Sequence, residues 1–541
     1  DSGSNSLKID NMSIVVGGTA TLDGKQITIN NGDLSFSNPQ GTPSFTNSTS
    51  LSVNNGALSF QGTSSFSNSS SLSVSNGALS FQGTSSFASS SLTVSNGEMI
   101  LQSGGSFSDT SLNFTSSIFK PSGTVSLTGS SALNFNGPSS IQLQEATTFT
   151  QSGSANWPSL DLNGKALTLN VTSMSIAGAL NIGNGDSLSS GSSILNLNNT
   201  VAIESGGTLT SGSGKVQISE ALTLGGELVQ GGGILNLIKG GTVGASGKLN
   251  MSGSELKLGD ELSFAGTLVV NSGTTWSGLG GTVDLSTGTL ESSGGTLNLD
   301  QFTTGANTAF KLSGNTEITS SDNMTFGTLD LGGNKLTLGT GSKGLTLPNT
   351  LTMDNASSAI ETKNVNLTLG KALSLTSGSI TSTGGTLSFS SGLTLGAQGT
   401  LDVTGSKLSA GGTLDLSSGT ISSDNSSLDL QAAITLSANN QVTGQNPVTF
   451  EDVHFNGNVL TLGSASTHLK VNDALALSGI PLETGAGNLT LSGALSLSNN
   501  AALNSSGGTI TLVSGASASS GTSISLPDTT LVLQNALSLA G

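Results

Sequence analysis

The sequence predicts an all-β protein whose fold is a right-handed parallel β-helix (β-solenoid), with about 21 residues per coil and little or no helix. The string LSVNNGALSFQGTSSF at residues 51–66 returns with one change at residues 72–87, a shift of 21 residues. Apolar residues recur two positions apart, which is the spacing of a strand with one buried face. Gly, Asn, Ser and Thr separate the apolar groups every few residues, and this pattern disfavours helix and favours turns.

Each copy of the repeat contains three short apolar groups separated by turn residues. In the copy at residues 51–66 these groups are Leu51 with Val53, Leu58 with Phe60, and Phe66 alone. A unit this small cannot bury its apolar face by itself, so neighbouring copies are expected to stack and share one core. The predicted ladders of stacked side chains are Leu34, Leu58 and Leu79; Phe36, Phe60 and Phe81; and Phe45, Phe66 and Phe87.

Further copies extend the predicted stack. An earlier copy, from Ile27 to Phe45, carries three extra residues around Pro39 and Pro43, as expected of a loop insertion, and a looser copy follows at residues 92–107. Crossovers between parallel strands are overwhelmingly right-handed, which predicts the hand of the coil. A strand spacing of roughly 4.8 Å then gives roughly 25 coils and a rod on the order of 120 Å long.

A longer repeat overlies the coils. It reads WPSLDLNGKALTL from Trp157, FGTLDLGGNKLTL from Phe326 and FEDVHFNGNVLTL from Phe450, with a partial copy, TLDGKQITI, from Thr21. The aligned glycines Gly24, Gly164, Gly333 and Gly457 are 140, 169 and 124 residues apart. We interpret residues 1–155, 156–324, 325–448 and 449–541 as four unequal modules of one continuous rod, because no long Pro-rich or charged linker separates them. Separate small barrels or sandwiches are the alternative.

The composition excludes several function classes. All 15 basic residues are Lys, so the chain lacks the planar Arg side chain that binds phosphate through two hydrogen bonds. Its net charge of −17 repels nucleic acid. The absence of Cys removes disulfides, thiolate metal sites and thiol nucleophiles. No stretch approaches the roughly 18 apolar residues of a membrane helix, so the chain is not expected to span a membrane.

Carboxylates that could act as a catalytic acid and base are scarce. Asp260 and Glu261 are adjacent, as are Glu451 and Asp452, and adjacent residues of a strand point to opposite faces. Glycoside-cleaving sites need two carboxylates facing one bond. Each pair is therefore expected to be a solvated turn.

The two histidines, His454 and His468, are expected at exposed or strand-edge positions. Asp452 precedes His454 by two residues and shares its face, so the pair could hold a metal or orient a base. Two ligands without a third are weak evidence for a metal site, and a surface pair is the favoured interpretation. We expect no catalytic, cofactor-binding or metal-binding residues, and no cofactor.

Other motifs have structural interpretations. The glycine pairs Gly206–Gly207 and Gly384–Gly385 lack the Asp of calcium-binding GGxGxD repeats and predict turns that enter strands. Trp157 and Trp276 could stack on a sugar, but Trp157 aligns with aromatic residues at the other module starts and predicts a recurring core residue. Sequons such as those at Asn47, Asn113 and Asn366 arise by chance in a chain so rich in Asn, Ser and Thr.

The alternating LTL, LSL and LDL strands with NG and GGT turns resemble the solenoid regions of filamentous-haemagglutinin-like adhesins and autotransporter passengers. The resemblance is one of pattern, and the translocator barrel and secretion-targeting domain of such proteins are not visible. It implies a parallel β-helix exported to the cell exterior or cell surface, acting as a spacer, fibre or adhesin.

A structural or adhesive segment of an extracellular bacterial surface fibre is therefore the expected function, and not an enzyme. A polysaccharide-processing β-helix enzyme and an ice-binding solenoid are the alternatives. Neither end of the sequence shows a polar cap, since the coil pattern is present by Leu7 and still present at Leu539. We expect the ends to continue into further coils, of the same polypeptide or of another copy of the chain. Host or neighbouring-cell surfaces and glycans are candidate further partners.

Overall fold

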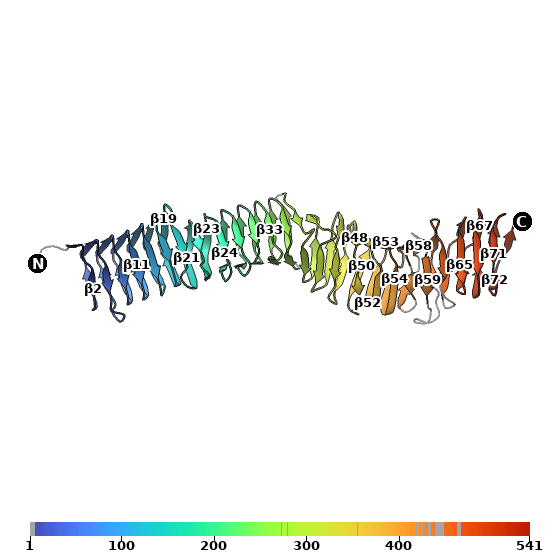
Figure 1. Cartoon of the computed structure of the whole chain (residues 1–541), viewed down its shortest axis with the longest axis horizontal. Helices are drawn as coiled ribbons and strands as arrows, with labels where there is room; N and C mark the ends of the chain where they lie inside the picture. Colours follow the sequence, from blue (N-terminus) through green and yellow to red (C-terminus); the bar gives the residue numbers. More distant parts are fainter. Residues whose placement is uncertain are drawn as a thin grey trace. The chain divides into compact units, whose positions relative to one another are not determined.

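The computed structural model describes residues 6–271, 273–278, 280–353, 355–412, 414–416, 419–423, 426–430, 434–438, 448–462 and 467–540. These residues form a parallel β-solenoid of about 24 turns with about 21 residues per coil, and no helix occurs among them (Figure 1). The predicted fold class is confirmed, whereas the right hand of the coil stays a prediction. The chain divides into two compact units: unit 1 comprises Asp1–Val269 and Gly273–Val283, and unit 2 comprises Val270–Ser272 and Asp284–Gly541. The four-module division also stays a prediction.

In the first coils of unit 1, each coil contributes one strand to each of three parallel sheets. Sheet A contains β1 (Ser6–Asp10), β4 (Gln26–Asn30), β7 (Ser50–Asn54), β10 (Ser71–Ser75), β13 (Ser91–Ser95), β16 (Ser111–Thr115) and β19 (Ala132–Asn136). Sheet B contains β2 (Ile14–Val16), β5 (Leu34–Phe36), β8 (Leu58–Phe60), β11 (Ala78–Phe81), β14 (Glu98–Leu101), β17 (Ile118–Lys120), β20 (Ser140–Gln142) and β22 (Leu160–Asp161). Sheet C begins with β3 (Thr21–Asp23), β6 (Ser44–Thr46), β9 (Ser64–Ser67), β12 (Ser85–Ala88), β15 (Gly105–Ser108), β18 (Gly123–Thr128) and β21 (Thr147–Trp157).

The predicted ladders are confirmed in register. Leu58 pairs with Leu34 and Leu79 in sheet B, and Phe66 pairs with Phe45 and Phe87 in sheet C. The rings form two stacks, with centroid distances of 4.9 Å for Phe36–Phe60 and Phe60–Phe81, and 4.5 and 4.4 Å for Phe45–Phe66 and Phe66–Phe87. The two stacks meet edge to face, for example Phe60 on Phe66 at 5.7 Å. Offset and edge-to-face rings each add about 0.5–1.5 kcal/mol beyond the area they bury.

An asparagine ladder follows the corner after sheet A. Its members have left-handed φ angles of 51–56°, a conformation that Asn tolerates better than most residues. From Asn31 onward, each side-chain amide donates to the amide oxygen of the preceding member at 2.9–3.2 Å. The members are Asn11, Asn31, Asn55, Asn76 and Asn96. Gly56 follows Asn55 in the chain. A Cβ on Gly56 would clash with the carbonyl oxygen of Gly32 at 2.1 Å, so this corner also requires glycine.

Buried hydroxyls follow the corner before sheet A. Thr49 Oγ1 donates to the Thr46 carbonyl at 2.6 Å and approaches the Leu22 carbonyl of the preceding coil at 3.0 Å. Ser70 does the same, with Ser67 at 2.6 Å and Phe45 at 3.1 Å. The hydroxyl closes the turn and ties it to the coil before it, which satisfies backbone groups that are buried from water.

The coil changes shape where the second predicted module begins. Strands β21 and β23 (Ala166–Ile176) are each 11 residues long, and their register shifts between Gln151 and Ser154. β23 then pairs with two shorter strands, β25 (Ser187–Gly191) and β26 (Ile194–Leu197). The predicted core aromatics at the module starts are all buried: Trp157, Phe326 and Phe450. The aligned glycines all have φ between 62° and 81°, which explains why glycine recurs there: Gly24, Gly164, Gly333 and Gly457.

Unit 2 repeats the same architecture. One sheet runs through β45 (Asn323–Thr325), β48 (Gly344–Leu347), β51 (Asn366–Leu369), β53 (Thr386–Phe389), β55 (Lys407–Ala410), β58 (Ser427–Leu430) and β61 (Asp452–His454). Two more contain β60 (Val448–Phe450), β63 (His468–Val471), β66 (Asn488–Leu491), β69 (Thr509–Leu512) and β72 (Thr530–Leu533), and β64 (Leu475–Ser478), β67 (Leu495–Ser498), β70 (Ala516–Ala518) and β73 (Leu537–Leu539). The longest strands of this unit, β52 (Leu373–Ser382) and β54 (Leu393–Asp402), belong to a further sheet that ends at β68 (Ala502–Ser505) and β71 (Ser523–Ser525).

Candidate functional site

A cleft of about 640 Å³ in unit 2 contains the predicted His454–Asp452 pair. Both residues belong to β61, two positions apart, and His454 Nε2 lies 3.4 Å from Asp452 Oδ1. Asp473 also lines this cleft, next to Ala474 and Ala476. His454 is 54% exposed, so water screens the pair and its attraction is weak. The structure brings the predicted pair together, with His454 exposed and Asp452 half-buried.

The other histidine has a different environment. His468 begins β63 and does not line the cleft, and its Nε2 lies 3.0 Å from Thr490 Oγ1. Burial lowers the pKa of the His468 imidazole, which favours the neutral ring. Among the described residues, no group of three or more His, Asp or Glu is arranged to hold a metal ion.

The adjacent carboxylates differ from one pair to the other. Asp260 and Glu261 lie exposed in the turn between β35 (Glu255–Leu258) and β36 (Leu262–Phe264), as predicted. The prediction of a solvated turn is wrong for Asp452. This residue is half-buried and begins β61, because it pairs with Ser427 of β58, and the Val453 side chain after it is buried in the core.

Three carboxyl groups have pKa values below their ordinary range, for structural reasons. The backbone N–H of Ser130 lowers the pKa of Asp109, and the backbone N–H of Ser321 lowers that of Asp300. The Ser277 hydroxyl, 2.5 Å away, lowers the pKa of Glu255. In each case the acceptor binds a neighbouring coil. A glycosidase general acid needs a pKa shifted in the opposite direction.

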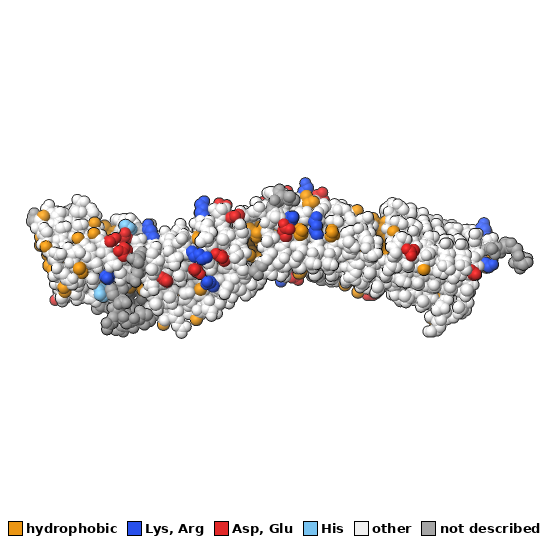
Figure 2. Space-filling model, turned by 180° about the vertical axis from the view of Figure 1, so that it is seen from behind, with side chains coloured by type: hydrophobic (Ala, Val, Ile, Leu, Met, Phe, Trp, Pro, Cys, Tyr) orange, Lys and Arg blue, Asp and Glu red, His pale blue; other side chains and the backbone are white. Residues whose placement is uncertain are grey.

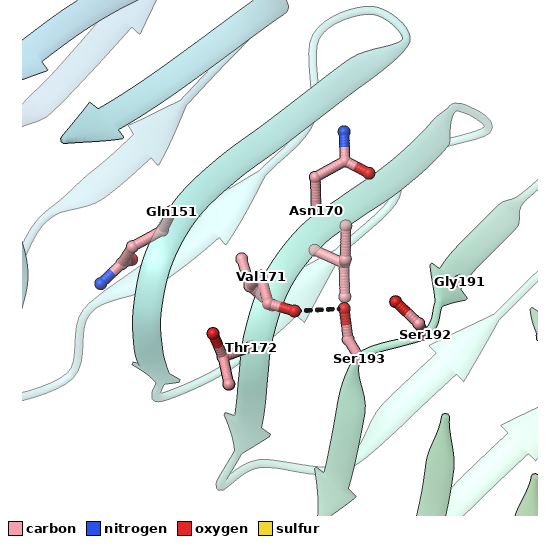
Figure 3. Close-up of a pocket in the computed structure, with 8 residues that line it drawn as sticks. Gln151, Asn170, Val171, Thr172, Gly191, Ser192 and Ser193 are labelled. Carbon is pink, nitrogen blue, oxygen red and sulfur yellow. Dashed lines mark hydrogen bonds between the residues drawn. The ribbon is translucent and has the colours of Figure 1, made fainter. Parts of the chain in front are cut away.

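A second hollow, of about 650 Å³, lies where β23 bends between its two partner strands (Figure 3). Its lining is uncharged and includes exposed Asn170, Thr172 and Ser192. Ser193 donates from Oγ to the Val171 carbonyl at 2.6 Å and closes one side. Its lining side chains can form hydrogen bonds but contain no group that titrates near neutral pH. No residue motif marks this hollow, because it results from the bend of the strand.

The glycine pairs and the sequon asparagines have structural roles in the coils. Gly206 and Gly385 have φ angles of 85° and 75° in turns that lead into β28 (Thr208–Ser211) and β53, which confirms the turn prediction. The sequon asparagines bond to neighbouring coils. Asn47 donates to Asp23, Asn113 accepts from Asn134 and Asn366 accepts from the Thr386 backbone.

The outermost coils expose members of the core columns. Leu7 of β1 pairs with Ile27 and continues its inward column, yet it is 51% exposed. At the other end Leu533 and Leu539 continue the columns of Leu512 and Ala518 and are 42% and 63% exposed. Within the described chain, β1 to β3 and β71 to β73 are paired along one edge only. Such edges present unpaired backbone groups and apolar surface to a further coil.

No helix in the described chain is long and apolar enough to cross a membrane. The sequence matches no protein-family model, no curated protein and no solved structure at the level of similarity that would establish a relationship.

Proposed function

We propose that this chain is a structural or adhesive segment of an extracellular bacterial surface fibre, and that it acts mechanically and not as an enzyme. The observation that carries the proposal is the stack of parallel coils, with core ladders in register and one open strand edge at each end. Force along the stack is shared by many backbone hydrogen bonds that run between coils. The location outside the cell rests on the resemblance to adhesin and passenger solenoids.

We further propose that the open edges bind further coils, either of the same polypeptide or of another copy. Covering Leu7 or Leu539 with another coil would contribute on the order of 1–2 kcal/mol per side chain, with backbone bonds in addition. A head-to-tail contact between unlike ends does not close on itself and so forms a filament.

Light scattering and negative-stain electron microscopy test this contact. The wild-type chain is expected to form particles that lengthen with protein concentration, and Leu7→Lys or Leu539→Lys is expected to abolish the lengthening. Val15→Lys is the matched control, because Val15 lies in the same coil as Leu7 and is 69% exposed but pairs with outward-facing Ser35. A wild-type monomer that resists concentration, or an equal effect of Val15→Lys, refutes the end contact.

The non-enzymatic part has its own test. Purified chain is incubated with neutral and acidic polysaccharides, and reducing ends are measured. Turnover that disappears when Asp452 or Asp473 is replaced by Asn would show that the cleft around His454 is catalytic and would refute the proposal.

A further inference from the structure

Five strands of sheet A, β4 to β16, present an uncharged outer array, which is bordered by the charged Lys8 and Asp10 of β1. Strands β4, β7, β10, β13 and β16 present three outward columns, and the partners within each column are in register. None of their members is charged, although the chain as a whole carries −17. The columns are Gln26, Ser50, Ser71, Ser91 and Ser111; Thr28, Ser52, Ser73, Thr93 and Asn113; and Asn30, Asn54, Ser75, Ser95 and Thr115.

The coils at the centre of this array carry no charge on any of their surfaces. Residues 34–97 contain no Asp, Glu, Lys, Arg or His. Elsewhere in unit 1 charged groups point outward from the coils, such as Glu98 with Lys120, and Glu227 with Lys248. On the side of the molecule seen in Figure 2, a few charged side chains lie at the N-terminal end, and the coils that follow are covered mainly by uncharged groups.

We infer that the outer surface of sheet A is a lateral contact for a second copy of this chain. Two copies repel each other wherever their acidic surfaces come within a Debye length of about 8 Å. The array on β4 to β16 is neutral on both partners, so side-by-side approach there has a small electrostatic cost. Strands β4, β7, β10 and β13 are also longer than the strands of sheets B and C in the same coils.

The shape of the surface also fits a second copy. In-register columns of small polar side chains, repeated at about 4.8 Å and free of charge, are the geometry in which two sheets interdigitate as a dry zipper. A second copy presents the same column spacing, so the two surfaces mesh through an isologous contact. The asparagine ladder along the edge of sheet A, with bonds of 2.9–3.2 Å, holds the columns in register.

The size of the surface indicates a weak contact. Five strands of five residues cover roughly 24 Å by 16 Å, or about 400 Å² per copy and about 800 Å² in total. Stable interfaces bury about 1,200–2,000 Å². A single pair of chains is therefore expected to associate only transiently, whereas filaments that present the surface repeatedly are expected to bundle by multivalency.

Cysteine cross-linking can detect a weak contact of this kind, and the chain has no cysteine of its own. Ser52→Cys, Ser73→Cys and Thr93→Cys are placed on sheet A and oxidised singly and in pairwise mixtures. Ser65→Cys, Ser86→Cys and Ser106→Cys on sheet C of the same coils are matched controls, and the native serines there are exposed. A disulfide requires Cβ atoms about 3.5–4.5 Å apart, so it reports direct contact of the two surfaces.

Cross-linked dimer is expected to form at least about 10-fold faster for the best sheet A pair than for any sheet C pair, a difference of about 1.4 kcal/mol. Adding Ser73→Glu to the Ser52→Cys and Thr93→Cys variants is expected to remove this advantage, and adding Ser86→Glu to the same two variants is expected to leave it. Circular dichroism of each variant verifies that the strands remain folded. Equal rates on the two sheets, or a rate unaffected by Ser73→Glu, overturns the inference.

The outcome is independent of the proposed end contact. Leu7→Lys blocks the strand edge but leaves sheet A intact, so sheet A cross-linking is expected to persist in that background. If sheet A instead retains the chain on an insoluble neutral polysaccharide while its cysteines do not cross-link, the surface binds glycan and the second-copy inference is wrong.

Discussion

Removal of one ring from the phenylalanine stacks is expected to destabilise the neighbouring coils strongly. Phe66 is 1% exposed and lies between Phe45 and Phe87 at 4.5 and 4.4 Å, with Phe60 against its edge at 5.7 Å. Truncation of a buried Phe to Ala costs about 3–5 kcal/mol, and the cost is highest where the site cannot collapse. Here the rings above and below are fixed by their own strand pairings, so Phe66→Ala is expected to cost about 4 kcal/mol.

Hydrogen exchange measured by mass spectrometry is the suitable assay. In a stacked repeat, each coil contacts only its neighbours, so the loss is local and a single unfolding free energy for the whole chain would obscure it. Peptides covering residues 50–88 are expected to lose roughly 100-fold or more of their protection, because about 1.4 kcal/mol corresponds to a factor of ten. Peptides several coils away are expected to be unaffected.

Two controls make the result interpretable. Ser65→Ala removes an exposed side chain from the same strand and is expected to change protection by less than about 0.5 kcal/mol. In a double-mutant cycle, Phe66→Ala and Phe87→Ala are expected to couple by about 0.5–1.5 kcal/mol. A loss below about 1.5 kcal/mol for Phe66→Ala would show that the stack relaxes around the gap, and would refute the reasoning that the ladders are rigid.

Three further predictions concern the corners. Asn55→Ala is expected to cost about 2 kcal/mol, because Asn55 has a φ of 54° and both donates and accepts a ladder bond. Asn55→Gly should cost less in hydrogen exchange, because glycine adopts this φ without strain. An equal cost for the two variants would exclude a contribution from backbone strain. Ser70→Ala is expected to cost about 1–3 kcal/mol, because it removes a buried hydroxyl that lies 2.6 Å from the Ser67 carbonyl and 3.1 Å from the Phe45 carbonyl. Ser70→Thr should be nearly neutral, because Thr49 and Thr110 occupy the equivalent position. The pKa of Asp109 is lowered in the folded state, so its ionised carboxylate stabilises the fold. This stabilisation is complete above the unfolded pKa of about 3.9 and is lost as the pH falls through the folded pKa. Asp109→Asn should remove this acid dependence from the hydrogen exchange of residues 105–131, and an unchanged pH profile would contradict the assignment.

The sequence predicted the fold well because the informative pattern is local and repeated. Leu34, Leu58 and Leu79 could be aligned by eye, and stacking then followed from the need of each small unit to bury one face. The core role of Trp157 followed from the same comparison between copies. A single copy of the motif would have supported neither prediction.

The uncharged hollow and the hydrogen bonds of the corners were not predicted. The hollow beside Asn170 exists because β23 passes from one pairing strand to two, and no residue type marks that change. The NG dipeptides of the sequence predict turns, but they do not predict that the Asn side chains of successive coils bond to one another at left-handed φ angles. Glu451 and Asp452 were expected in a solvated turn because adjacent strand residues point to opposite faces, yet Asp452 pairs with Ser427 and begins β61.

The chemistry of the interior coils also explains why the ends and sheet A differ as contact surfaces. A coil inside the stack is bound on both edges, by backbone bonds and by the columns of Leu, Val and Phe side chains, whereas Leu7 and Leu539 have only one neighbouring coil. Addition of a coil at an edge therefore repeats an interaction already present between every pair of coils, and its strength should approach that of an internal contact. Sheet A offers only side chains, with no backbone groups left to pair, so its contact is weaker and depends on the absence of charge. In a filament with both contacts, the edges would set the length and sheet A would set the thickness, and single charged substitutions at Leu7 and Ser73 should alter these two dimensions separately.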